Sequence, residues 1–202
     1  MNHLAHVVLA GPDEGFRLGA FLGDHVKGLQ ALEKLPSSWA AGVRLHRHID
    51  SFCDSHPAVA ELLENLQPPW RRYGGIIFDV LFDLMLTRHW DRFGPTDLNH
   101  MNQQISRMLA RHEAELPPRL VRFSRWASQR RLWLRLGQRD MLNEIFVLLA
   151  RRHGRSWPLA RGLSLLDAHD AAIEAAFLRL FPDLMESVRR ERIRLYSTLS
   201  MM

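Results

Sequence analysis

The sequence predicts an all-α protein that folds as a single helical bundle-like domain. Apolar residues recur at helical spacing from end to end, and the alternating apolar and polar runs typical of strands are almost absent. The 202 residues, of which 47% are hydrophobic and 24% charged, have the composition of one globular unit. We therefore expect residues 1–202 to form one domain of about seven or eight helices.

Capping and breaking residues set the first helix boundaries. Asp13 is suited to cap a helix that stops near Gly28, where glycine favours a left-handed C-terminal cap. Pro36 begins the next helix, which runs to about Cys53. A proline disfavours helical conformation in the residue before it, so Pro57 marks a break and opens a shorter helix.

The middle of the chain contains its most apolar segment. The short helix before it ends near the Pro-Pro pair at 68–69. From 70 to about 93 the apolar density is highest, which predicts a central buried helix with a kink at the Gly-Gly pair at 74–75. A Gly-Pro pair at 94–95 ends this helix.

Four further helices are predicted in the second half. Thr96 or Asp97 is suited to cap the first of them, and the proline pair at 117–118 starts another that continues to Trp133. Residues 141–150 form a third. The last begins near Ser164 and passes Pro182, which is tolerated in a first turn or produces a kink.

Positive charge is in excess and is carried almost entirely by arginine. The 27 Lys and Arg residues against 22 Asp and Glu residues give a formal net charge of +5. Because guanidinium suits carboxylates and phosphates, the excess indicates either an acidic or phosphorylated partner or a solvated helix surface. The second half of the chain holds a concentration of these residues, at Arg119, Arg122, Arg125, Arg130, Arg131, Arg135, Arg139, Arg151, Arg152 and Arg155.

The single cysteine, Cys53, excludes a disulfide within the chain and has no neighbour that would activate it. The amino terminus lacks the basic segment and long apolar run of a secretory signal. The most apolar segments, at 76–86 and 171–181, contain charges and are shorter than the roughly 20 residues of a spanning helix. These observations predict a cytoplasmic protein without a membrane partner.

Two aspartates interrupt the apolar central helix. Asp79 and Asp83 are four residues apart, so their side chains lie on the same face, one turn from each other. Burying a carboxylate costs several kcal/mol unless a positive group meets it. That group is either an arginine, in a purely structural role, or a metal ion.

A second polar stripe comes from the segment RLHRHIDSFCD. His46, Asp50 and Asp54 are spaced four residues apart and share one helical face. Imidazole and carboxylate on adjacent turns are typical of divalent-cation sites, and two such helices facing each other suit manganese, iron or zinc. Alone, the histidine is as well explained as a hydrogen-bonded surface residue, but the second carboxylate stripe favours a metal site.

Motifs of several large enzyme classes are missing. The sequence contains no GxxxxGK[ST], GxSxG, HExxH or GxGxxG pattern. Nucleoside-triphosphate loops, serine hydrolysis of the α/β type, zincin proteolysis and dinucleotide binding therefore have no support. Only Trp126 and Trp133, seven residues apart among arginines, fit a nucleic-acid pattern, and we expect no nucleic-acid partner.

Five segments carry a family resemblance. They are MNHLAH, GAFLGDHVKG, GVRLHRHIDSFCDSHP, FDVLFDLMLTRHW and LDAHDAAIEAAFLRLFPDLM. The most specific is the HRxIDxxxDxxP pattern that starts at His46. In these motifs the chain resembles the acyl carrier protein phosphodiesterase family, which is similar in architecture to the helical HD phosphohydrolases. Leu84 stands where that family often has histidine, so the role of that histidine is missing or supplied elsewhere, with His89 as the candidate.

The resemblance implies a metal-dependent reaction, typically with manganese. In that reaction the 4'-phosphopantetheine arm is removed from holo acyl carrier protein. The family likeness assigns six residues to the active site: His6, Asp24, His46, Asp50, Asp79 and Asp83. Spacing alone does not single out His6 or Asp24, which are equally well explained as a core histidine and a surface carboxylate beside Lys27.

We expect each active-site residue to have a defined role. The expected metal ligands are His46, Asp50, Asp79 and Asp83. Asp24 is expected to be a further ligand or the base that orients water, and His6 the acid.

The basic residues are expected to bind substrate. Lys27 and Arg47 would offset phosphate charge, and a surface containing Arg119, Arg122 and Arg125 would bind the acidic carrier protein. Two other functions remain open at this stage. One is a metal phosphohydrolase of a small nucleotide or phosphate ester, and the other is a basic helical adaptor without catalytic activity.

Overall fold

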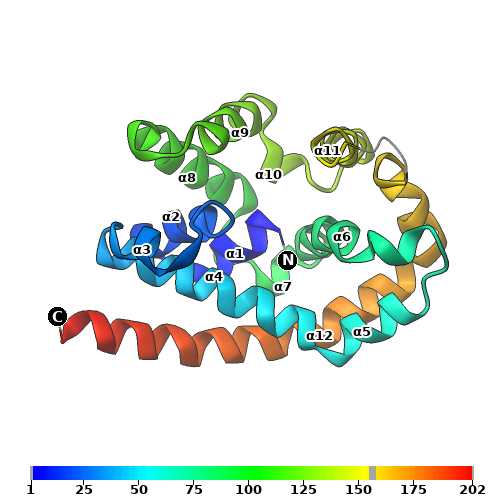
Figure 1. Cartoon of the computed structure of the whole chain (residues 1–202). Helices are drawn as coiled ribbons and strands as arrows, with labels where there is room; N and C mark the ends of the chain where they lie inside the picture. The colour runs from blue at the N-terminus through cyan, green and yellow to red at the C-terminus, as the bar shows by residue number, and fades with distance from the viewer. Residues whose placement is uncertain (1, 155–157, 202) are drawn as a thin grey trace.

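The computed structural model describes residues 2–154 and 158–201, and within these ranges it contains helices and no strand (Figure 1). The all-α prediction is confirmed. Arg155, part of the predicted arginine concentration, lies outside the described residues. The α-helices are α1 (His3–Ala10), α2 (Glu14–Leu22), α3 (Gly28–Glu33), α4 (Ser37–Ser55), α5 (Pro57–Glu64), α6 (Gly74–Arg88), α7 (Trp90–Phe93), α8 (Leu98–Arg111), α9 (Pro118–Arg130), α10 (Leu132–Arg135), α11 (Arg139–Arg152) and α12 (Gly162–Ser200). Short 3₁₀ helices lie at Trp70–Arg72, Glu113–Glu115 and Leu159–Arg161.

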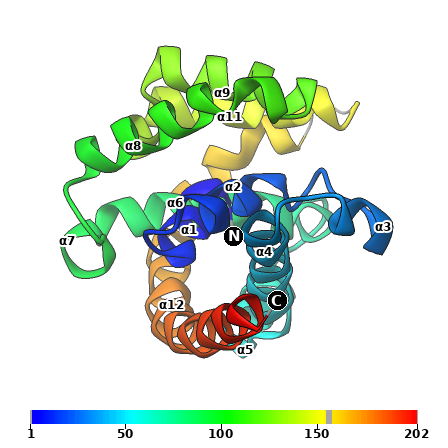
Figure 2. The same ribbon diagram turned by 90° about the vertical axis from the view of Figure 1, so that its left-hand side faces the viewer.

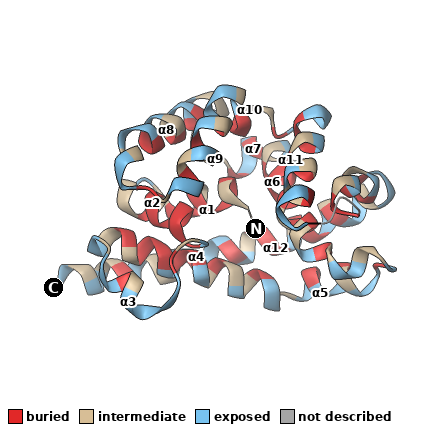
Figure 3. Cartoon of the chain, turned by 45° about the horizontal axis from the view of Figure 1, so that its top comes forward, coloured by how far each residue is buried: buried red, intermediate tan, exposed pale blue. Residues whose placement is uncertain are grey.

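The helices are arranged in two groups with α1, α2 and α6 between them. In Figures 1 and 2, α8, α9 and α11 lie above α1, α2 and α6, while α4, α5 and the long α12 lie below. Buried residues concentrate on the faces where these groups meet (Figure 3). One cluster of buried apolar side chains includes residues from α1 through α12. None of the described helices is long and apolar enough to cross a bilayer.

Several predicted helix starts are confirmed by their caps. The Asp13 side chain accepts a hydrogen bond from the backbone N–H of Phe16 at 2.9 Å and begins α2. Asp97 does the same for His100 at 3.0 Å and begins α8. His56 ends α4 and caps α5, as expected for a residue before proline.

Other boundaries differ from the prediction in the first half of the chain. Residues 3–10, for which we predicted no helix, form α1. Helix α2 ends at Leu22, and Gly28, with φ of 77°, is the first residue of α3 rather than the end of α2. The central apolar segment does not kink at its glycine pair. Instead α6 begins at Gly74 and ends at Arg88, and α7 is separate.

The second half shows two further differences. Helix α9 stops at Arg130, because Arg131 adopts a left-handed conformation with φ of 51°, and this leaves Trp133 in α10. Helix α12 passes Pro182 but has its non-helical residue at His169 (φ −132°, ψ 17°). The break in α12 therefore lies earlier than the proline.

Helices α2 and α4 approach unusually closely through two glycines. A Cβ on Gly19 would lie 2.3 Å from the carbonyl oxygen of Trp39, and a Cβ on Gly42 would lie 2.4 Å from that of Phe16. Such distances exclude any larger residue unless the backbone moves. This contact holds α4 against α2 at the level where α4 presents its polar stripe.

Candidate active site

His46 of α4 is the buried residue at the centre of the site. Its Nδ1 lies 2.9 Å from the carbonyl oxygen of Ala20, and since a carbonyl only accepts, Nδ1 carries the proton. In the neutral ring Nε2 then keeps its lone pair and points the other way, an arrangement typical of metal-binding histidines. Gly23 makes room for the ring, because a Cβ there would lie 2.2 Å from it.

Asp50, one turn further along α4, joins two histidines. Its Oδ2 lies 3.0 Å from Nε2 of His46, and its Oδ1 lies 3.0 Å from Nε2 of His6 in α1. The two imidazole rings stack with centroids 4.1 Å apart. Ligand atoms from His6, His46 and Asp50 all lie within 4.8 Å of one another, the only such group of three found among the described residues.

The donor set of this three-residue group fits a divalent cation. A lone pair on His46 Nε2 facing a carboxylate oxygen at 3.0 Å is repulsive unless a proton or a cation lies between the two atoms. Two imidazole nitrogens and a carboxylate suit manganese, iron or zinc. Asp24 lies at the edge, with its Oδ1 3.9 Å from His46 Nε2 and its side chain 54% exposed, and can complete the ligand set.

Burial and hydrogen bonding shift the ionisation of the group. Burial lowers the pKa of His6 to about 4, although its hydrogen bond with Asp50 acts in the opposite direction. At Asp50, burial raises the pKa, but hydrogen bonds with His46 and His6 outweigh it and hold the pKa below its usual range. The group therefore favours neutral His6 and ionised Asp50, the protonation states in which both residues bind metal.

Asp83 of α6 lies apart from this group, contrary to our expectation for a ligand. Its Oδ2 accepts the backbone N–H of Leu4 at 2.9 Å, and its Oδ1 accepts that of Ala5 at 3.1 Å. The carboxylate therefore caps the N-terminus of α1 from a distant part of the chain. Burial raises the pKa of Asp83 to about 7, although the two backbone N–H groups lower it.

Asp79 is also outside the three-residue group. It is largely buried, and burial raises its pKa. Both α6 aspartates line the cleft described next, as does Asp54 of the predicted α4 stripe. The structure therefore brings the two carboxylate stripes to one cleft but does not bring all their oxygens to one point.

A cleft of about 800 Å³ opens over His46 and Asp50. Its facing wall comes from α9, α10 and α11 and is mainly apolar, with aromatic contributions from Phe123, Trp126 and Trp133. Arg119 and Arg122, which we expected on the surface that binds the carrier protein, also line it, whereas Arg125 does not. The Arg125 side chain instead bonds both carboxylate oxygens of Glu113.

Sequence reasoning did not single out some cleft residues. His25 follows Asp24 directly, and Arg152 was noticed only as one of many arginines. Burial lowers the pKa of His25, Asp24 raises it, and the charges of Arg152 and Arg119 lower it further. The proximity of these side chains depends on how α9 and α11 fold over the loop after α2, which no local sequence signal indicates.

Lys27 and Arg47 are not among the residues that line the cleft. Lys27 is exposed at the start of α3. Arg47 donates from Nη2 to the carbonyl oxygen of Val26 at 2.9 Å and so fixes the loop after α2. His89, the candidate substitute for a histidine at 84, pairs with Glu174 of α12 at 2.6 Å.

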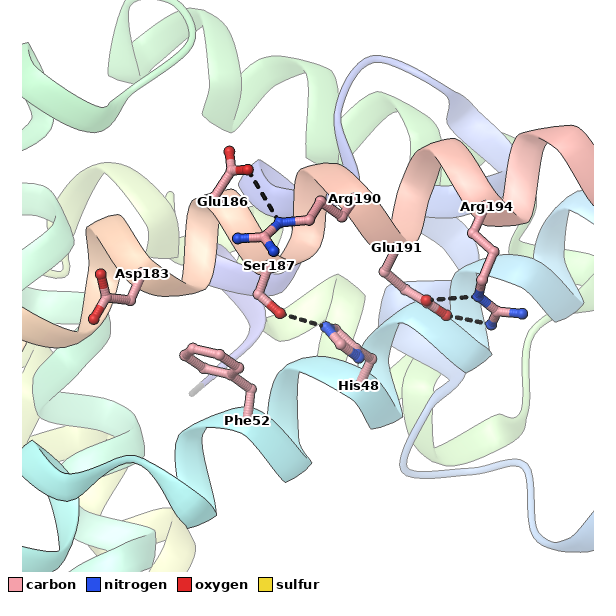
Figure 4. A pocket seen from close by; sticks show the side chains of 8 residues that line it. All are labelled: His48, Phe52, Asp183, Glu186, Ser187, Arg190, Glu191 and Arg194. Atoms are coloured by element: carbon pink, nitrogen blue, oxygen red, sulfur yellow. Dashed lines mark hydrogen bonds and ion pairs between the residues drawn. The ribbon is translucent and has the colours of Figure 1, made fainter.

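A second hollow of about 520 Å³ lies between α4 and α12 (Figure 4). His48 and Ser187 hydrogen-bond across it at 2.9 Å. Its acidic and basic side chains pair along α12, as in Glu186 with Arg190 and Glu191 with Arg194. Most polar groups of this hollow thus bind one another, and substitutions in it are suitable controls for substitutions in the cleft.

Comparison with known proteins places this geometry in a family. The sequence profile described as Acyl carrier protein phosphodiesterase matches residues 1–184. The chain belongs to the acyl carrier protein phosphodiesterase family. A relative of that name from Escherichia coli O6:K15:H31 (strain 536) is 30% identical over 194 residues, which cover 96% of this chain and 100% of the relative. The acyl carrier protein phosphodiesterase of Escherichia coli O157:H7 is 30% identical over 198 residues, with the same coverage.

A relative of the same name from Escherichia coli strain K12 / DH10B is 29% identical over 198 residues, and the match covers its whole length. No solved structure matches this chain. The expected likeness to HD phosphohydrolases therefore stays a prediction.

Proposed function

We propose that this protein hydrolyses the phosphodiester that joins 4'-phosphopantetheine to the serine of holo acyl carrier protein, releasing apo carrier protein and the free arm. The observation that carries this proposal is the three-residue group of His6, His46 and Asp50, of which His46 and Asp50 line a cleft, in a chain of this family. The names of the relatives agree with that substrate.

His6, His46 and Asp50 are the proposed ligands of a divalent cation, for which we propose manganese. When bound, such a cation lowers the pKa of a water molecule and stabilises negative charge on phosphoryl oxygens. We assign His6 to this ligand set rather than to the role of acid, because its Nε2 faces Asp50 at 3.0 Å. Asp79 and Asp83 support the site from outside it.

Asp24 is the proposed base. Its side chain is exposed at the cleft, and its Oδ1 lies 3.9 Å from His46 Nε2, which leaves room for a water molecule to bind and to give up a proton. His6 and His46, both buried, would exclude bulk water from that side of a bound phosphodiester. These placements suit attack of water from the floor of the cleft.

Mass spectrometry of holo acyl carrier protein tests the proposal directly. The wild-type protein in manganese is expected to convert the carrier protein to the apo mass, and a chelator or Asp50→Ala is expected to abolish the conversion. Asp183→Ala, in the second hollow, is the matched control and should behave as wild type. Full conversion by Asp50→Ala would overturn the assignment of the site.

The substrate class is checked in the same assay. Turnover of free nucleotides or simple phosphate esters in place of the carrier protein would favour a small-molecule phosphohydrolase. Absence of both bound metal and turnover would favour the basic adaptor.

A further inference from the structure

Hydrolysis of a phosphodiester in this cleft needs positive charge from residues other than Lys27 and Arg47, which the sequence suggested. Phosphodiester hydrolysis gathers negative charge on the phosphoryl oxygens, and enzymes place fixed cationic donors against it. Lys27 and Arg47 are not among the cleft residues, and Arg47 is engaged with the Val26 carbonyl. The cations that do line the cleft are Arg119 and Arg122 of α9 and Arg152 of α11.

Apart from Arg151, which is exposed and outside the cleft, the arginines of α9 to α11 fall into two sets. Those facing away from the cleft bind carboxylates or an amide: Arg125 with Glu113, Arg130 with Glu144, Arg131 with Asn99, Arg135 with Asp140 and Arg139 with Asp167. Arg119, Arg122 and Arg152 make no ion pair or side-chain hydrogen bond within the described parts of the chain. The cleft thus holds three arginines of α9 and α11 that are left unpaired within the described parts of the chain.

These three arginines converge from two helices. Arg119 and Arg122 are three residues apart and share one face of α9. Arg152 is the last residue of α11, one turn beyond Leu149, which lines the same cleft. Asp24 and its neighbour His25 line the same cleft as Arg119 and Arg152, so these arginines share one cavity with the proposed base.

We propose that Arg152, with Arg119 and Arg122, binds the phosphate of the 4'-phosphopantetheine arm. This inference rests on the proposed function for the identity of the phosphate ester. A guanidinium fork bonds two phosphoryl oxygens at once and remains charged throughout the working pH range. Binding the phosphate between these arginines and the three-residue group would place the phosphorus beside Asp24.

The test is calorimetric titration with free 4'-phosphopantetheine and with pantetheine, which lacks the phosphate. Arg152→Ala is expected to weaken binding of 4'-phosphopantetheine about 10-fold or more, since a hydrogen bond to a charged group is lost. Binding of pantetheine should be unchanged. Arg152→Lys keeps the charge without the fork and should fall between the two.

Arg151→Ala is the matched control. Arg151 is the preceding residue of α11, is exposed and does not line the cleft, so its removal changes net charge equally but should leave both titrations unaltered. Thermal unfolding of each variant, followed by circular dichroism, verifies that the fold is intact.

Two results would overturn the inference. One is wild-type affinity of Arg152→Ala for 4'-phosphopantetheine. The other is an effect of Arg152→Ala confined to the Michaelis constant for holo carrier protein, which would make Arg152 a docking residue. If the protein binds 4'-phosphopantetheine through Arg152 yet releases no arm from carrier protein, the phosphate site stands and the proposed reaction fails.

Discussion

At the scale of single residues, the contacts of His6 and Asp83 favour roles other than the ones that sequence reasoning gave them. The Nε2 of His6, which we expected to be the acid, lies 3.0 Å from Oδ1 of Asp50, and its ring stacks on that of His46. Asp83, expected as a ligand, accepts two backbone N–H groups of α1. The two changes are connected, because Asp83 caps the first turn of the helix that carries His6. In our proposal His6 binds the cation, and Asp83 holds the helix in place.

Replacing His6 tests whether it is a ligand. His6→Gln is expected to weaken manganese binding at least 10-fold, because one nitrogen of the ligand set is lost. The measurement is equilibrium dialysis with metal analysis. His48→Gln, which removes a histidine of α4 in the second hollow, should bind manganese as wild type does. Normal metal affinity in His6→Gln together with an altered pH profile would restore the acid role.

Asp83 should make stability depend on pH in a defined direction. Its folded-state pKa of about 7 lies above the 3.8 of an unperturbed aspartate, so its contribution is fully present below about pH 4 and is lost as pH rises through 7. The unfolding temperature of the metal-free protein should therefore fall less between pH 5 and pH 8 in Asp83→Asn than in wild type. His6, whose pKa is lowered, acts in the opposite direction in both proteins.

Comparing Asp83→Asn with wild type separates the effect of the Asp83 carboxyl group from that of His6, which is present in both proteins. Asp91→Asn, an exposed aspartate of α7, is the control and should reproduce the wild-type profile. Equal pH profiles for Asp83→Asn and wild type would contradict the prediction.

At the scale of elements, the close contact of α2 and α4 sets the site. The carbonyl that fixes His46 belongs to Ala20 of α2, so the tautomer of a residue in α4 depends on the distance between the two helices. That distance is possible only because Gly19 and Gly42 face each other.

Gly19→Ala is expected to destabilise the protein by about 1–3 kcal/mol, because the new methyl group meets backbone atoms that cannot rotate away. Gly75→Ala is the matched control: a Cβ there has nothing within 4 Å, and removing glycine freedom from a helix should change stability by less than about 1 kcal/mol, in the stabilising direction. Chemical denaturation measures both. Equal stability of Gly19→Ala and wild type would exclude a tight contact.

Local signals in the sequence predicted much of the fold. Asp13 and Asp97 were recognised as caps, and the break before Pro57 followed from proline sterics. Helix α1 was missed because it has only 8 residues, no acidic residue in its first turn and part of its capping from Asp83. The end of α9 at Arg131 was missed because arginine rarely adopts positive φ.

The candidate site shows the same division. The four-residue spacing of His46 and Asp50 predicted their common face, since it follows from helix geometry alone. His6 and Asp24 came only from family resemblance, because their distances to His46 depend on how α1 and α2 pack against α4. Arg152 was noted only as one of many arginines, and nothing in the sequence placed it near the site.

At the scale of the whole molecule, charge should govern association with an acidic carrier protein. Arg122 lines the cleft without an ion-pair partner among the described residues, whereas Arg125 is neutralised by Glu113. Arg122→Glu is therefore expected to raise the Michaelis constant for holo carrier protein more than Arg125→Glu at low salt. The difference should shrink above about 0.15 M salt, where the Debye length is about 8 Å. Equal constants for the two variants would contradict the prediction.

The chain divides its chemistry between two continuous stretches. The proposed metal ligands and Asp24 precede residue 51, and the cleft arginines all lie between α8 and α11, a stretch that enters after Gly94 and leaves before the break at His169. Residues of α6 line the same cleft beside these two stretches. The width of the cleft therefore depends on how the second stretch packs over the first.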